Sequence, residues 1–170
     1  MLEFKTPQIE DKAWVDQCFK HLKTMNCDYT FGNMFVWSTE YSTKICRFKD
    51  FFICSWGMGK ETNFGIPVGK GDFKEAVEEV IKYAKANDIM PRFYGVTEAY
   101  VEMLNENFPD AFQFSYDESY GDYIYEVEKM ASLKGKKYHG KRNHITNFKK
   151  NNPNWSFETI NKYNIDNCIN

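Results

Sequence analysis

The stretch "DFKEAVEEVIKYAKAND", from Asp72 to Asp88, decides the fold class of this 170-residue chain. Asp72 followed three residues later by Glu75 is a capping-box pattern, which marks the start of a helix. Apolar residues then recur at helical spacing, so that one face of the helix is buried. The residues on this face are Phe73, Ala76, Val77, Val80, Ile81 and Ala84.

The segments around this helix alternate between strand and helix patterns. Before it, "STKICRFKDFFICSWG" predicts two strands that turn near Lys49 and Asp50, and "NFGIPVG" predicts a third. Helices are expected over about Ile9–Leu22, over "DYTFGNMFVW" with Asp28 as its cap, and from Thr97 to about Phe108. Further strands are expected in "RFYGV", "AFQFSY", "DYIYEV" and "WSFETI". This order predicts an α/β (α+β) sandwich around one mixed sheet.

Composition indicates an ordinary folded domain in a reducing compartment. Hydrophobic residues make up 42% of the chain and aromatic residues 18%, which excludes a disordered chain. The N-terminus lacks the pattern of a secretory signal, and no apolar run is long enough to span a membrane. Five Cys without a C-x-x-C pair argue against a disulfide framework or a zinc site. We therefore expect a cytoplasmic protein without a metal.

Positive charge is concentrated in "KGKKYHGKRNHITNFKK", Lys134–Lys150, which we call the basic segment. It holds seven of the 22 Lys and Arg residues and no Asp or Glu, although the whole chain has a formal net charge of −2. The residues outside it include 15 basic and 24 acidic side chains. Solvated helices usually alternate Glu with Lys, so the missing acids favour an anionic partner over a simple solvated basic face.

The basic segment predicts the last helix of the chain, which ends at Asn151-Asn152-Pro153. At helical spacing, Tyr138, Ile145 and Phe148 form an apolar stripe with Lys141 in its middle and Arg142 and Lys149 at its flanks. Lys141 then either extends past the core into water or meets an anion, such as a phosphate or carboxylate, in a partly enclosed cleft. A metal site at His139 and His144 is not expected, because their spacing does not place them on one face.

A second candidate phosphate site is the turn Gly69-Lys70-Gly71, which lies between a strand and the Asp72 helix. Backbone N–H groups at such a turn can bind phosphate. However, Asp72 would put its own negative charge at the helix N-terminus, which favours a purely structural turn.

Two aromatic groups are weaker candidates. Tyr29, Asn33 and Trp37 share one helical face, where they could stack a ligand or pack in the core. A second group borders a predicted strand, where a hydroxyl could assist proton transfer or pack in the core; it comprises Tyr120, Asp122, Tyr123 and Tyr125.

Four stretches together resemble the soluble bacterial proteins that carry the phosphatidylglycerol lysyltransferase C-terminal domain. They are "CDYTFGNMFVW", "PVGKGDFKEAVEEV", "RFYGVTEA" and "KGKKYHGKRNHITNFKKNNPNW", and the resemblance extends from about Phe4 to Ile160. The family pattern Lys-x-x-x-Lys-Arg-Asn-x-x-x-x-Phe matches Lys137, Lys141, Arg142, Asn143 and Phe148.

This resemblance implies a GNAT-like domain of three layers, with a mixed, mostly antiparallel central sheet and helices on both faces. The chain would hold the first of two such domains, over residues 1–160, and residues 161–170 would begin the linker to the second. Without a membrane half, a lipid acceptor is not implied. A signature for binding the pyrophosphate of CoA is incomplete, because Ile66 occupies its first position before Gly69 and Gly71.

The resemblance also implies aminoacyl or acyl transfer from a donor that carries phosphates, namely an aminoacyl-tRNA or an acyl-CoA. The expected donor-binding residues are Lys137, Lys141, Arg142, Asn143, Lys149 and Lys150, and Gly69, Lys70 and Gly71 are the weaker alternative. No tightly bound cofactor is expected, and no catalytic residue can be named. Two further hypotheses stay open: a non-catalytic module that binds RNA or another anion, and a structural domain that supports its twin.

Overall fold

The computed structural model describes residues 2–118 and 121–169. Within it the chain divides into two compact units, Met1–Asp122 and Tyr123–Asn170, which we call unit 1 and unit 2. Each is described by itself. The single domain expected over residues 1–160, with a linker from residue 161, stays a prediction.

Unit 1 is built on the hairpin of β1 (Lys44–Phe48) and β2 (Phe51–Trp56), which pair antiparallel as predicted. Lys49 in the turn has a φ of 52°, the left-handed conformation that tight turns use. Five of the six residues of β2 are buried, so this strand is covered on both faces.

Three short strands complete a mixed, mostly antiparallel sheet in unit 1. β3 (Asn63–Gly65) and β4 (Val68–Gly69) both pair antiparallel with β2, and β5 (Phe93–Tyr94) pairs parallel with β3. The single strand predicted over "NFGIPVG" is therefore two strands. Pro67 lies between them, and it has no N–H group to donate to a continuous ladder.

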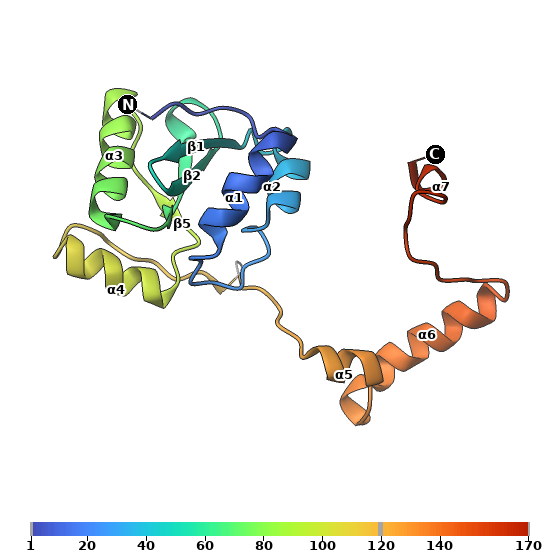
Figure 1. The fold of residues 1–170 in the computed structure, drawn as a ribbon. Helices are drawn as coiled ribbons and strands as arrows, with labels where there is room; N and C mark the ends of the chain where they lie inside the picture. Colours follow the sequence, from blue (N-terminus) through green and yellow to red (C-terminus); the bar gives the residue numbers. More distant parts are fainter. Residues whose placement is uncertain (1, 119–120, 170) are drawn as a thin grey trace. The chain divides into compact units, whose positions relative to one another are not determined.

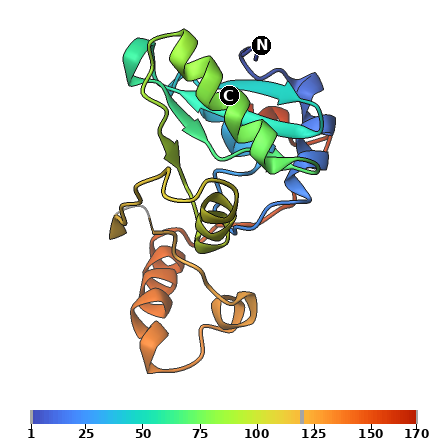
Figure 2. The same ribbon diagram turned by 90° about the vertical axis from the view of Figure 1, so that its left-hand side faces the viewer.

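Helices cover both faces of this sheet, which confirms the three-layer prediction (Figures 1 and 2). Successive residues of a strand point to opposite faces, and the hairpin alternates accordingly. One face packs against α1 (Lys12–Phe19) and α2 (Phe31–Trp37); its residues are Ile45, Phe52 and Cys54, in contact with Val15, Cys18, Phe31 and Met34. The other face packs against α3 (Phe73–Ala86); its residues are Cys46 and Ile53, in contact with Val80 and Ala84.

The first two helices are shorter than predicted. The segment expected as one helix over Ile9–Leu22 is a 3-10 turn, η1 (Ile9–Asp11), followed by α1 (Lys12–Phe19). The cap of α2 (Phe31–Trp37) was predicted wrongly: the Thr30 hydroxyl accepts the Asn33 N–H, whereas the Asp28 carboxylate accepts from the Asn33 side chain at 2.8 Å. A second 3-10 turn, η2 (Gly59–Glu61), precedes β3.

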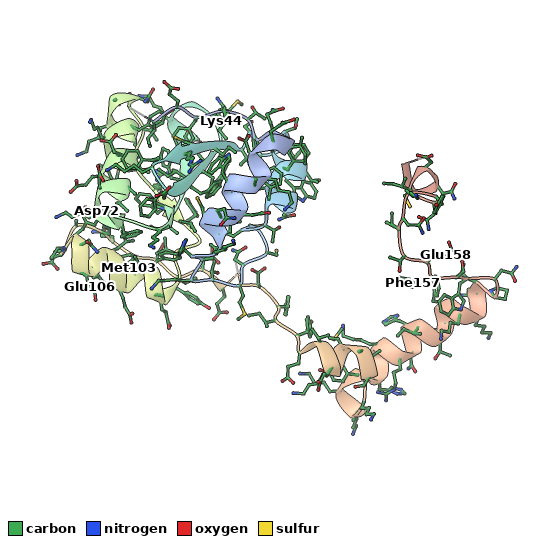
Figure 3. All side chains as sticks on the ribbon, in the orientation of Figure 1. Lys44, Asp72, Met103, Glu106, Phe157 and Glu158 are labelled. Carbon is green, nitrogen blue, oxygen red and sulfur yellow. The ribbon has the colours of Figure 1, made fainter. Side chains whose placement is uncertain are left out.

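The helix predicted from Asp72 onward is α3 (Phe73–Ala86), with Asp72 as its cap. The Asp72 carboxylate accepts the Glu75 N–H at 3.0 Å, at the start of the helix where Figure 3 labels it. Then α4 (Glu98–Asn107) follows Thr97 as predicted and packs on α3 through stacked Phe73 and Tyr100 rings, 6.4 Å apart.

Unit 2 is helical, and three strand predictions there and just before it are wrong. Residues 111–116, 122–127 and 155–160 form no strand in the described chain, because no neighbouring segment supplies the backbone partners that a strand needs. The observed elements are α5 (Val127–Ser132), η4 (Lys136–Tyr138), α6 (His139–Asn151) and α7 (Asp166–Ile169). The basic helix α6 ends near Pro153 as predicted, but α7 follows it.

The Asp11 side chain connects the N-terminal segment of unit 1 to the start of α1 through hydrogen bonds. Its carboxylate accepts from Lys5 Nζ at 2.6 Å, from Trp14 Nε1 at 2.9 Å and from the Gln8 N–H at 2.9 Å. Burial alone would raise the pKa of this carboxyl, but these hydrogen bonds and the Lys5 charge outweigh it, so the pKa is lowered.

Asp11→Asn should lower the free energy of unfolding by about 1–3 kcal/mol at pH 7, because it removes a charge-assisted acceptor. A carboxyl whose pKa is lowered in the folded state stabilises the protein above its unfolded pKa, and this contribution is lost as the pH falls through the folded value. The difference between wild type and variant, measured by urea unfolding, should therefore shrink below about pH 4. A difference that is constant from pH 7 to pH 3 would contradict this role.

Candidate functional site

The basic segment is more exposed than predicted. Tyr138 is buried, but Ile145 and Phe148 are 45% and 53% exposed, and α6 itself has no buried residue. Lys141 is exposed as well. The predicted packed apolar stripe is therefore wrong, because no described element of unit 2 covers that face of the helix. Of the two alternatives for Lys141, extension into water is the one that the structure shows.

Three lysines of the segment lie over aromatic rings. Lys141 Nζ is 5.5 Å from the centroid of Tyr125, Lys149 Nζ is 5.0 Å from the Trp155 ring, and Lys137 Nζ is 5.8 Å from the Tyr138 ring. Such cation–π contacts position an ammonium group but leave part of it open to water. Among the described residues, no carboxylate lies within ion-pair distance of these lysines or of Lys150.

Arg142 differs from the lysines because its guanidinium is used inside unit 2. It donates to the carbonyl of Leu133 and, at 2.8 Å, to that of Gly135. Leu133 has a φ of 48° and Gly135 a φ of 96°, so Arg142 holds the irregular turn between α5 and α6. Asn143 lies one turn from His139, with 3.2 Å between the Asn143 side-chain nitrogen and His139 Nε2.

Aromatic side chains surround these cations in unit 2. Tyr123 and Tyr125 stack with centroids 6.4 Å apart, and Phe148 meets Trp155 at 6.4 Å. Phe157, labelled in Figure 3, is 86% exposed. Tyr120, which was grouped with them in the sequence, lies outside the described residues. Unit 2 therefore carries exposed lysines next to exposed aromatic rings.

The Gly69-Lys70-Gly71 turn has a structural explanation. A Cβ on Gly69 would lie 2.1 Å from the Asp50 carbonyl oxygen and 2.7 Å from the Phe51 Cα, so only glycine lets these backbones meet. Gly71 has a φ of 135°, which a side chain would strain. Asp72 caps α3 at the position where a phosphate would bind.

Sequence reasoning missed a cavity of about 480 Å³ in unit 1. Tyr29, Asn33 and Trp37 all line it, although only Asn33 and Trp37 lie on α2 and Tyr29 precedes its cap. Other walls come from the segment before β1, from β2, from β5 and from the end of unit 1; they include Tyr41, Trp56, Tyr94 and Asp122. The sequence pointed to the group of Tyr29, Asn33 and Trp37 and, separately, to Asp122, but the walls are too far apart along the chain to be recognised as one cavity.

Two lining groups of the cavity are kept neutral. Burial raises the pKa of the Cys54 thiol to about 12, and burial also raises the pKa of Tyr29. Burial therefore favours the neutral thiol of Cys54 over the thiolate, which is the nucleophilic form. Within residues 2–118 and 121–169, no three metal-ligating side chains gather at one place.

Gly69→Ala should destabilise unit 1 by about 2–3 kcal/mol or prevent folding, because the added Cβ meets backbone atoms. Lys70→Ala should leave the melting temperature unchanged, since the Lys70 side chain is exposed. Binding of inorganic phosphate and acyl-CoA, measured by calorimetry on Lys70→Ala, should match the wild type. A clear loss of binding there would restore the turn as a phosphate site.

Arg142→Met should loosen the α5–α6 turn by about 1–3 kcal/mol, because it leaves two backbone carbonyls without their donor. Amide hydrogen exchange should accelerate over residues 133–142 while the exchange of β2 in unit 1 is unchanged. Lys150→Met provides the matched control, since it removes a positive charge from the same helix without touching the turn. Equal exchange in both variants would contradict the structural role of Arg142.

The described chain has no helix with the length and apolar character that crossing a membrane requires.

Comparisons with known proteins agree with this architecture. Among curated proteins, none matches the sequence significantly. A crystal structure of a conserved protein of unknown function from Bacteroides thetaiotaomicron is similar, at 30% identity and a TM-score of 0.84. The alignment covers 99% of this chain, which spans 57% of that chain.

A family model described as "Phosphatidylglycerol lysyltransferase, C-terminal" matches residues 19–170. The match includes the central sheet, the cavity and the whole basic segment. It confirms the family predicted from the four quoted stretches. This chain therefore belongs to the family of phosphatidylglycerol lysyltransferase C-terminal domains.

Proposed function

We propose that the chain is one half of an aminoacyl- or acyl-transferase, and that unit 2 binds the phosphate-bearing donor. The observation that carries this proposal is the basic segment, in which Lys137, Lys141, Lys149 and Lys150 are exposed and have no acidic partner in the described chain. Like charges in one helix repel each other, and an anionic ligand relieves that repulsion. Membership of a lysyltransferase-related family supports transfer as the reaction class.

Between the two donors, an aminoacyl-tRNA fits unit 2 better than an acyl-CoA. The amino acid of an aminoacyl-tRNA sits on a single-stranded 3′ end, and proteins bind such ends by stacking bases on aromatic rings beside phosphate-binding cations. The stacked Tyr123 and Tyr125 rings and the Phe148–Trp155 pair lie beside lysines in this way. An acyl-CoA fits less well, because the Gly69-Lys70-Gly71 turn does not form a pyrophosphate site. Gly69 in this turn packs directly against the backbone of Asp50 and Phe51.

A non-catalytic RNA-binding module is the second candidate, because the same exposed lysines and rings would serve it equally. The two functions differ in one respect. A transferase recognises the amino acid on the tRNA, whereas a module recognises the nucleic acid alone. The negative balance outside the basic segment limits either mode to a local contact rather than a broad nucleic-acid surface.

Lys141→Met and Lys149→Met should each weaken binding of aminoacyl-tRNA about fivefold at low salt, or ~1 kcal/mol. Each should also reduce the slope of log affinity against log salt by about 0.7–0.9, the value for one lost phosphate contact. Fluorescence anisotropy with labelled tRNA across salt concentrations measures both quantities. Because Lys141 and Lys149 are exposed, the melting temperature should not change.

Lys85→Met is the matched control, since it removes an exposed lysine from α3 in unit 1. It should leave affinity and salt slope unchanged. Tighter binding of charged than of uncharged tRNA supports transfer, and equal binding supports the RNA-binding module. If tRNA and acyl-CoA both fail to bind at low salt, the proposed donor site is wrong.

A further inference from the structure

The unit 1 cavity is walled by aromatic rings, and among the described residues no cation lies over those of Trp37, Tyr41 or Trp56. Trp37 and Tyr41 lie against each other with centroids 5.9 Å apart, and Trp56 meets Tyr94 edge-on at 5.9 Å. Seven cation–π pairs occur among the described residues, and none of them involves Trp37, Tyr41 or Trp56. Trp37 is 49% exposed, so a ligand can reach its ring.

The same cavity is lined by two carboxylates, Asp28 and Asp122, and by no Lys, Arg or His among the described residues. Neither carboxylate forms an ion pair within the described chain. Asp28 is held in place by the Asn33 side chain at 2.8 Å, while its own N–H donates to Asn26 Oδ1 at 2.7 Å. The cavity therefore carries negative charge on a fixed group next to ring faces.

Rings with negative faces and an oriented carboxylate are the combination that proteins use to bind ammonium groups. We propose that the unit 1 cavity binds a small organic ligand through an alkylammonium group, with Asp28 as its counter-ion and Trp37 and Trp56 as its ring contacts. The rings desolvate the alkyl part of the cation, and Asp28 supplies the opposite charge. Asp122 adds a second negative charge at the same cavity.

Other ligand classes fit the cavity less well. An anion would meet two carboxylates without a compensating cation in the lining. A bare metal ion needs at least three suitable ligands, and the described residues contain no such group. A volume of about 480 Å³ lies within the range of small-molecule sites and exceeds what one ion needs.

Choline and its uncharged isostere dimethylbutanol, in which carbon replaces nitrogen, form the decisive pair of probes. We expect choline to bind the full chain at least about tenfold more tightly than dimethylbutanol. Isothermal calorimetry and the quenching of Trp fluorescence measure both affinities. Butylammonium, compared with butanol, tests a primary ammonium in the same way. Preference for choline over butylammonium identifies a ring-dominated site, and the reverse preference identifies one dominated by Asp28. If the uncharged partner of each pair binds as tightly as the cation, or if neither cation binds, the proposal is overturned.

Two variants locate the site. Asp28→Asn keeps the shape of the side chain and should weaken binding of the preferred cation about tenfold, and Trp37→Leu should weaken it by a similar factor. Glu40→Gln is the control for Asp28, because it removes an exposed carboxylate that lies next to α2 but outside the cavity lining. The affinity of Glu40→Gln for the preferred cation should equal that of the wild type. If Asp28→Asn and Trp37→Leu both melt like the wild type and still bind the cation with unchanged affinity, the ammonium site is not in this cavity.

This proposal is independent of the proposed donor site, since the cavity is lined by unit 1 residues alone. Lys141→Met should therefore bind choline or butylammonium as the wild type does, while it loses affinity for tRNA. If the wild-type chain binds an ammonium cation but neither tRNA nor acyl-CoA, only the donor site is contradicted. If it binds tRNA but neither ammonium cation, only the cavity ligand is contradicted.

Discussion

The structure of unit 1 depends on the burial of β2 on both of its faces. A strand with Phe52 and Ile53 fully buried on opposite sides cannot be covered by one layer, so helices from before and after the hairpin must close over it. This constraint fixes α1 and α2 on one face and α3 on the other. It also brings β4 close enough to β2 that Gly69 must be glycine, and it places Cys54 in the cavity lining.

Local signals in the sequence were sufficient for the elements that this constraint organises. Asp72 and the helical spacing after it predicted α3, and the Lys49-Asp50 turn predicted the hairpin, because caps and tight turns are decided by neighbouring residues. The strands expected in "AFQFSY", "DYIYEV" and "WSFETI" are absent because an alternating pattern shows only that a strand is possible. Backbone pairing needs a partner, and the described chain provides none for them.

The candidate sites were predicted unequally for the same reason. The charge of the basic segment is visible in its composition, but the packing of α6 is not, so Lys141 was placed in a packed apolar stripe that the structure does not form. Arg142 was grouped with the anion-binding lysines, although its hydrogen bonds go to the Leu133 and Gly135 carbonyls of a turn that the sequence did not reveal. The cavity was missed because its walls come from separate segments, and the sequence did not connect Asp122 with the group of Tyr29, Asn33 and Trp37.

Cation–π contacts distinguish the two candidate sites. In unit 2 the rings of Tyr125, Tyr138 and Trp155 already carry lysines of the chain, so a cationic ligand would meet repulsion there and an anionic one attraction. In unit 1 the rings of Trp37 and Trp56 carry no described cation and lie in a cavity with Asp28, which reverses the preference. The same interaction thus favours opposite ligands, according to whether the protein supplies the cation itself.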